Sequence, residues 1–261
     1  APAMALPPPP SQPGGMARSL REKAGRLAAA RQARGQAPGR DCYRLLRRAA
    51  TLEAAQSLAR PGRCDLEQAA RQLAGALGAL CPLRPDQLAF FGTGAPLPVG
   101  LSGRQLTAAL CHLACNSLLY GGPGARLCLK TGQAGGRAYF YLADTGPGLA
   151  AQRWFSPGLH PQEGLGLAYC RLAASRAGGA LLGWNRKGGA GGFSCLLALP
   201  LAQGACPPFS PLFLPEDRFS PYLIQLSPGC ILLPWSHWIP PTGRESVDPP
   251  ETRRRTDGER R

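Results

Sequence analysis

Hydrophobic residues along this chain fall into short runs with helical or strand spacing, separated by glycine and proline. Leucine and alanine recur every three to four positions in several segments, which predicts amphipathic helices. Short apolar runs bounded by Gly-rich stretches predict strands. The predicted helices are 17–33, 42–59, 66–80, 103–120 and 164–177, and the predicted strands are 88–91, 126–131, 137–143, 180–185 and 192–199.

Capping residues and chain breakers support these boundaries. Asp41, Asp65 and Ser102 each precede a predicted helix, where a side-chain oxygen can accept an unpaired backbone N–H. The sequence GGPG at 121–124 ends the long helix, and GQAGG at 132–136 predicts the turn of a hairpin. The pattern therefore alternates helices with strands in the manner of an α/β domain.

The element order divides the chain into four parts. Residues 64–203 hold the alternating elements of one α/β domain, and residues 17–60 predict a helical hairpin before it. Residues 1–16 are rich in Pro and Gly, residues 204–261 are rich in Pro, and both are expected to be disordered. Glycine (34) and proline (28) together fall just below the share that indicates low complexity.

The formal net charge of +15 raises the question of nucleic-acid binding. Only three of the 30 basic residues are lysines, and the arginines are scattered, which indicates compositional bias. Residues 101–203 hold nine basic residues but only two acids, Asp144 and Glu163. We expect no specific nucleic-acid binding, and a general basic binding protein is a minor hypothesis that charge alone supports.

The ten cysteines form no Cys-x-x-Cys pair, and the three histidines are too few to complete a clear zinc site. Cys111 and Cys115 share a helix face in apolar surroundings, so they are expected to be small buried hydrophobes. Neither a signal peptide nor a spanning segment is visible. The expected location is a reducing cytoplasm, either free or tethered to a membrane through a missing N-terminal sensor region.

Three short motifs follow one another in the predicted α/β domain. The long helix contains His112-Leu-Ala-Cys-Asn116, a strand ends in Asp144-x-Gly-x-Gly148, and Gly164-x-Gly-Leu167 opens a later helix. Each motif alone is weak, since Asp-x-Gly-x-Gly is most often a turn and an Asn in a helix is usually solvated. Their order, each on the element it requires, indicates a nucleotide site.

The chemistry of these residue types suits a nucleoside triphosphate. A carboxylate after a strand can accept a hydrogen bond from the exocyclic amine of a base, and adjacent glycines let the backbone approach the ring. Gly-x-Gly at a helix N-terminus presents N–H groups to phosphates, and an Asn amide oxygen can bind a magnesium ion that bridges phosphates. The loop 149–163 between the glycine motifs is a natural lid.

With these motifs, residues 64–201 resemble the ATP-binding domain of sensor histidine kinases, in the GHKL superfamily that includes the DNA gyrase and MutL ATPase domains. The resemblance implies a two-layer α/β sandwich, the Bergerat ATP-binding fold, with ATP and Mg²⁺ as cofactors. It implies that Asn116 binds Mg²⁺, that Asp144 holds the adenine amine, and that Gly146 and Gly148 shape the base pocket. It also implies nucleotide-binding positions at Tyr120, Gly164, Leu165 and Gly166, with the three residues 164–166 lining the phosphates.

Two departures from the family pattern bear on function. The hairpin 17–60 resembles a degenerate form of the dimerisation helices, yet no histidine precedes His112, so the usual phosphoacceptor is absent in cis. His112 itself stands where the family usually has Asn or Glu, and it is the candidate catalytic residue, although a merely half-exposed helix position is an equal alternative. Gly191-Gly192 replaces a Thr or Ser that is common before the last strand.

These features lead to two functional hypotheses. The first is a histidine kinase-type phosphotransferase of a two-component system, which uses Mg-ATP, forms a homodimer, and acts with a response regulator or with a partner that supplies the phosphoacceptor. The alternative is a catalytically degenerate ATP-binding module that regulates a partner by docking.

Overall fold

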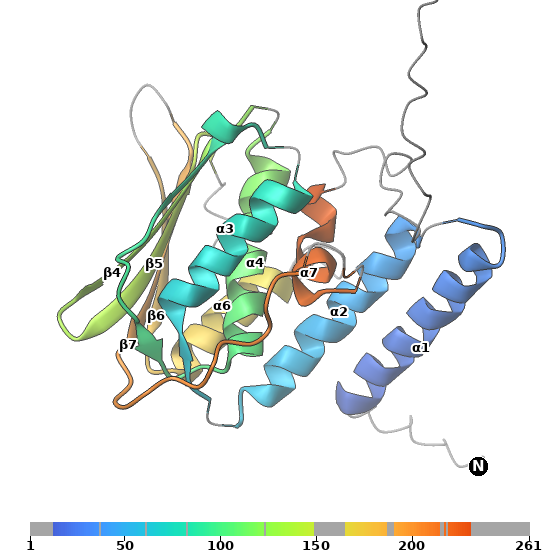
Figure 1. Cartoon of the computed structure of the whole chain (residues 1–261), viewed down its shortest axis with the longest axis horizontal. Helices are drawn as coiled ribbons and strands as arrows, with labels where there is room; N and C mark the ends of the chain where they lie inside the picture. The colour runs from blue at the N-terminus through green and yellow to red at the C-terminus, as the bar shows by residue number, and fades with distance from the viewer. Residues whose placement is uncertain are drawn as a thin grey trace, which may run out of the picture.

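The computed structural model describes residues 13–36, 38–60, 62–81, 83–122, 124–148, 165–186, 191–214, 217 and 219–230. Helices and strands alternate through the middle of the chain, and helices stand at both ends of the described part (Figure 1). The elements are α1 (Pro13–Gln32), α2 (Arg40–Ser57), β1 (Cys64–Asp65), α3 (Leu66–Leu80), the short 3-10 helix η1 (Pro85–Gln87), β2 (Leu88–Phe91), β3 (Pro98–Val99), α4 (Gly103–Tyr120), β4 (Leu127–Ala134), β5 (Arg137–Asp144), α6 (Leu165–Arg176), β6 (Ala180–Asn185), β7 (Phe193–Pro200) and α7 (Pro221–Cys230).

A five-stranded mixed sheet organises the fold, with strand order β2-β4-β5-β7-β6. β2 pairs parallel with β4, and the other neighbours pair antiparallel. Alternate residues of β5 are buried on one face, namely Ala138, Phe140 and Leu142, because side chains of a strand alternate between the two faces of a sheet. β1 and β3 form a separate two-stranded ribbon.

Helices α3, α4 and α6 cover the buried face of the sheet, and the other face carries no helix in the described part of the chain (Figure 1). Apolar residues at helical spacing explain this packing, since Leu66, Leu73 and Leu77 of α3 are fully buried. The α/β sandwich predicted from the sequence is confirmed.

A second set of helices packs on the outer side of this layer. α2 contacts α4, α6 and α7, while α7 contacts α4, α3 and α2 (Figure 1). As a result α4 is enclosed almost all round, and 14 of its 18 residues are buried. The helix that holds His112 and Asn116 is therefore the centre of the molecule.

The predicted hairpin of helices is present at the N-terminal end. α1 and α2 pack along each other, and Arg21 forms a two-point ion pair with Glu53 that joins them. α2 also buries Tyr43 and Leu46 toward the rest of the fold. The hairpin is thus attached to the α/β domain through α2, with α1 on the outside.

Several boundaries predicted from the sequence are wrong. α1 begins at Pro13 rather than at residue 17, so residues 13–16 are helical. β4 and β5 extend to a two-residue turn at Gly135 and Gly136, whose positive φ angles of 54° and 73° suit a tight hairpin turn.

The predicted disorder of residues 204–261 is wrong for the part that the structure describes. α7 buries Tyr222 and Leu226 completely, and residues 231–261 lie outside the described residues. The helix forms because Pro221 stands in its first turn, where a missing N–H costs nothing, and because the apolar run that follows covers α4.

The cysteines behave as small hydrophobes, as the sequence suggested. All ten are free thiols, and all except Cys128 and Cys206 are buried. No helix in the described part of the chain is both long and apolar enough to cross a membrane.

Candidate functional site

Asp144 is a buried carboxylate at the end of β5, and three donors fix its orientation. The Ser117 hydroxyl donates to Oδ2 at 2.8 Å, and the backbone N–H groups of Gly146 and Phe193 donate to Oδ1 at 3.0 and 3.1 Å. The side chain is 4% exposed. Because a carboxylate offers about four acceptor positions, one remains available for an amine of a ligand.

The glycines after Asp144 are required by close contacts. A Cβ at Gly146 would collide with the backbone of Gly121, which follows α4. Gly148 has a φ of +87°, and a Cβ there would lie 2.8 Å from Oδ1 of Asn185. The Asp144-x-Gly-x-Gly148 loop is therefore held between the end of α4 and the end of β6 with no space for side chains at these two positions.

Gly192 and Arg186 complete this corner from the other side. Gly192 has a φ of +102°, and a Cβ there would collide with the carbonyl oxygen of Asp144. The Arg186 guanidinium donates to that same carbonyl. The hydroxyl residue that the family pattern favours near this position would not fit this backbone, which explains the Gly191-Gly192 pair.

α4 contacts residues of two of the sequence motifs. Ser117 of α4 contacts Asp144, and five residues earlier His112 contacts α6, where a Cβ on Gly166 would lie 3.0 Å from His112 Nδ1. Asn116 is half-buried between them on the same helix. The structure thus brings Ser117 to Asp144 and His112 to Gly166, and Asn116 lies on the same helix.

The remaining predicted residues are placed less completely. Tyr120 is the last residue of α4 and is half-buried, while Leu165 begins α6 with 40% of its surface exposed. Gly164 and the predicted lid 149–163 lie outside the described residues. The first turn of α6 contains no acidic residue, which keeps its N-terminal N–H groups suited to an anion.

His112 is buried and both of its ring nitrogens are bonded to α2. The Arg47 guanidinium donates to Nδ1 at 2.9 Å, and Nε2 lies 3.0 Å from the Thr51 hydroxyl. Thr51 donates its own proton to the carbonyl oxygen of Arg47, so Nε2 must carry the proton of a neutral ring. Burial first, and the nearby Arg47 charge second, lower the pKa of His112 well below 6.5.

These contacts bear on the predicted catalytic role of His112. A ring whose only lone pair accepts from Arg47 cannot take a proton from a substrate in this arrangement. A catalytic role would therefore require Arg47 to move. The geometry as it stands makes His112 a residue that joins α2 to α4.

A metal ion would have few protein ligands at this site. No group of three or more His, Cys, Asp or Glu side chains is placed to hold a metal among the residues that the structure describes. Asn116 offers one amide oxygen, which fits a Mg²⁺ ion that takes its other ligands from phosphates and water. Binding of Mg²⁺ would thus depend on a nucleotide.

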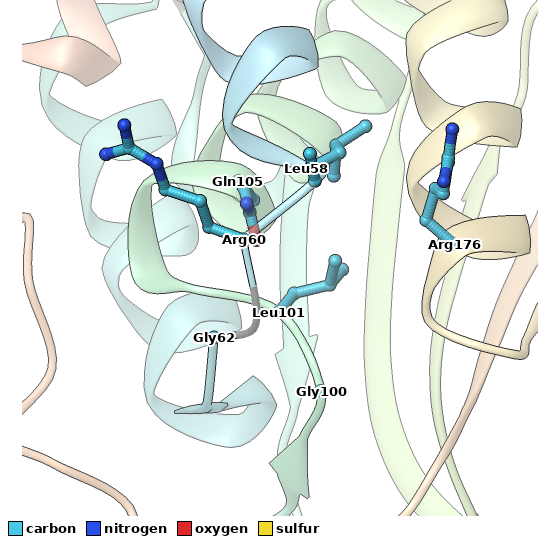
Figure 2. A pocket seen from close by; sticks show the side chains of 8 residues that line it. Leu58, Arg60, Gly62, Gly100, Leu101, Gln105 and Arg176 are labelled. Atoms are coloured by element: carbon cyan, nitrogen blue, oxygen red, sulfur yellow. The ribbon is translucent and has the colours of Figure 1, made fainter.

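A cavity of about 440 Å³ lies at the opposite end of α4, between the end of α2 and the end of α6 (Figure 2). Figure 2 shows Arg60 and Arg176 on its two sides, and Gln105 there donates to the Ser57 carbonyl at 2.7 Å. None of the motif residues lines it. It is separate from the nucleotide-type site.

The sequence did not identify four residues that define the site. Ser117 adjoins Asn116 in the motif, and that adjacency was a usable signal. Sequence spacing did not mark three further residues, because they act through tertiary contacts. Arg186, which follows β6, contacts the Asp144 carbonyl, and Arg47 and Thr51 of α2 contact His112.

No family model and no curated protein matches this sequence. Among solved structures, full-length ShkA in complex with AMPPNP matches with a TM-score of 0.54 and 22% identity, over 76% of this chain and 47% of ShkA. The mycobacterial sensor histidine kinase MprB matches at 22% identity and a TM-score of 0.43, over 53% of this chain and 97% of that one. The histidine kinase AdeS of Acinetobacter baumannii matches at 15% identity and a TM-score of 0.45, over 71% of this chain and 97% of AdeS.

The match to ShkA shows a shared fold. The chain spans about half the length of ShkA. The mixed sheet with helices on one face is the architecture that the motifs implied, and the chain shares its fold with ShkA.

Proposed function

We propose that this chain binds Mg-ATP and acts as a histidine kinase-like phosphotransferase of a two-component system, with the phosphoacceptor supplied by a partner. The observation that carries the proposal is the buried Asp144 carboxylate at the end of β5, which the Ser117 hydroxyl and the backbone N–H groups of Gly146 and Phe193 hold in place. The fold shared with ShkA, whose structure contains the ATP analogue AMPPNP, supports it.

Each site residue has a role that its surroundings suit. Asp144 accepts the adenine amine at its remaining acceptor position, and Gly146 and Gly148 shape the base pocket by letting the loop pack closely against Gly121 and Asn185. Leu165 and Gly166 at the start of α6, together with the preceding Gly164 of the motif, bind the phosphates, and Tyr120 closes the site at the end of α4. Asn116 holds Mg²⁺, which when bound neutralises phosphate charge.

The sequence and the hairpin point to a partner for the phosphoryl group. No histidine precedes His112, so neither α1 nor α2 offers the usual acceptor. α1 exposes two apolar side chains, Met16 and Leu27, at 46% and 37%, and a second copy of the hairpin would cover them. We therefore infer a homodimer that acts on a response regulator or on another phosphoacceptor protein.

Calorimetric titration with ATP, with and without Mg²⁺, tests the proposal. Asp144→Asn should weaken ATP binding at least tenfold, because a hydrogen bond to a charged acceptor contributes about 1.5–3 kcal/mol. Asp86→Asn, an exposed carboxylate in η1, is the matched control and should leave binding unchanged. Equal affinities for all three proteins, or no binding to the wild type, would remove the basis of the proposal.

The second candidate is an ATP-binding module without turnover. It is favoured by the engagement of both His112 nitrogens by α2 and by the missing acceptor. Incubation with γ-labelled ATP separates the two. Label transferred to a partner or to water, and lost in Asn116→Ala, supports the kinase, whereas ATP-dependent thermal stabilisation without release of label supports the module.

A further inference from the structure

Two cysteines far apart in the sequence meet where the C-terminal ends of α3 and α7 adjoin. The Sγ atoms of Cys81 and Cys230 lie 3.0 Å apart, and the two residues are only 5% and 7% exposed. Cys81 follows α3 as its C-cap, and Cys230 is the last residue of α7. A disulfide bond measures about 2.05 Å, so the sulfurs need to approach by roughly 1 Å.

The packing of α7 holds Cys230 in this position. At the adjacent Gly229, a Cβ would lie 2.7 Å from Cδ1 of Leu118, so the end of α7 fits directly against α4. The backbone N–H of Gly229 donates a hydrogen bond to the thiol of Cys115, so this neighbouring sulfur has a partner of its own. The packing of Gly229 against Leu118 therefore holds Cys230 beside Cys81, independently of any bond between the two sulfurs.

We propose that Cys81 and Cys230 form a reversible disulfide that fastens α7 to the end of α3. The oxidant is a low-molecular-weight disulfide such as oxidised glutathione. One protein thiolate attacks it, forms a mixed disulfide and releases one glutathione thiol. The second protein thiolate then attacks the protein sulfur of the mixed disulfide and releases the second glutathione thiol, so that two protein thiols are oxidised and one glutathione disulfide is reduced.

The bond would act on the whole molecule because of where α7 lies. The bridged residues are 149 positions apart in the sequence. The segment between them includes α4 and all strands of the five-stranded sheet. α7 contacts α2 as well as α3 and α4, so fastening it also secures the surface on which the hairpin rests (Figure 1). This inference does not depend on the proposed function.

The Cys230 thiol should react slowly at neutral pH. The hydrogen bond with Cys81, together with burial, raises the pKa of the Cys230 thiol above its ordinary value, and only the thiolate attacks a disulfide. Formation of the bond should therefore be faster at pH 9 than at pH 7.

The test uses the full chain equilibrated with mixtures of reduced and oxidised glutathione, followed by alkylation, mass determination and peptide mapping. We expect oxidation to remove two alkylatable thiols, to produce a linked peptide pair containing Cys81 and Cys230, and to raise the melting temperature by about 5 °C or more. Dithiothreitol should reverse all three changes.

Cys81→Ser and Cys230→Ser should each abolish the linked peptide and the temperature shift. Cys128→Ser, which removes a half-buried thiol in β4, should retain both. A linkage through any other pair, or retention of all ten thiols in the folded wild type under oxidising mixtures, would overturn the proposal. If a serine variant does not fold, the peptide map and its reversal in the wild type still decide.

Discussion

Gly192 stands at a position where the backbone conformation and the space both require glycine. Its φ of +102° is unfavourable for other residues, and a Cβ would meet the carbonyl oxygen of Asp144. The same carbonyl accepts from Arg186. The backbone of Gly192 and the Arg186 side chain thus both lie against the Asp144 carbonyl, and a single added methyl group should disturb this corner.

We expect Gly192→Ala to lower the free energy of unfolding by about 3 kcal/mol, since the strain of positive φ and the collision with Asp144 both contribute. Gly124→Ala is the control, because Gly124 has a φ of +82° but open space around its Cβ, and it should cost only about 1 kcal/mol. Urea unfolding of both variants measures the difference. Equal losses would show that the collision is relieved without cost.

Site residues that act through their local sequence could be predicted, and those that act through tertiary contacts could not. Asp144 and its glycines were identifiable because a carboxylate at a strand end followed by Gly-x-Gly is a local pattern. The bond from Ser117 to Asp144 joins residues 27 positions apart, and the one from Arg186 to the Asp144 carbonyl joins residues 42 apart. Such contacts follow only from the assembled sheet and helices.

α7 shows that an element can form where composition argues against it. The proline content of residues 204–261 indicated a disordered tail, yet α7 covers α4 and leaves Leu226 fully buried. Its own propensity is low because it contains Pro228 and Gly229. The helix is therefore stabilised by packing, which a pattern-based prediction does not include.

The burial of α7 predicts a clear difference between two leucine substitutions in the same region. Leu226→Ala should destabilise the protein by about 3 kcal/mol through lost burial and the cavity it leaves. Leu214→Ala, at a residue 54% exposed, should change stability by less than about 0.5 kcal/mol. Thermal and urea unfolding check both, and a neutral Leu226→Ala would mean that α7 does not belong to the core.

At the scale of the whole molecule, the hairpin and the α/β domain are joined through the Arg47–His112–Thr51 contacts. These contacts require a neutral imidazole, because Nδ1 accepts from a guanidinium. The pKa of His112 is lowered in the folded protein by burial and by Arg47. The unfolded chain therefore binds a proton more readily than the folded chain once the pH falls below 6.5.

Stability should consequently decrease as the pH is lowered from 7.5 to 5, and the part due to His112 should be absent in His112→Gln. Urea unfolding at several pH values measures this, and the slope of the wild type against pH should exceed that of the variant. Because the other titratable groups are the same in both proteins, identical slopes would exclude His112 as the source.

The general architecture could be predicted because helices and strands alternate with clear periods. The order of elements in 64–203 and the helical hairpin were both visible in the spacing of Leu and Ala. The third layer was not, because the contact of α2 and α7 with α4 depends on which outer faces of the helices remain apolar. Leu110 and Cys111 of α4, for example, are adjacent and both fully buried. The sequence of this helix therefore does not show which of its faces packs on the sheet and which packs on α2 and α7.

The position of α7 also has a consequence for synthesis of the protein. Its partners α2, α3 and α4 all precede the sheet's last strands, so they emerge from the ribosome well before the helix that covers them. Until residues 221–230 are available, the apolar outer side of α4 stays exposed, which favours association with other chains or with chaperones. Contacts between distant parts of a chain also slow folding. This protein should therefore complete the core around α4 only after residues 221–230 have been synthesised, when α7 packs against α4.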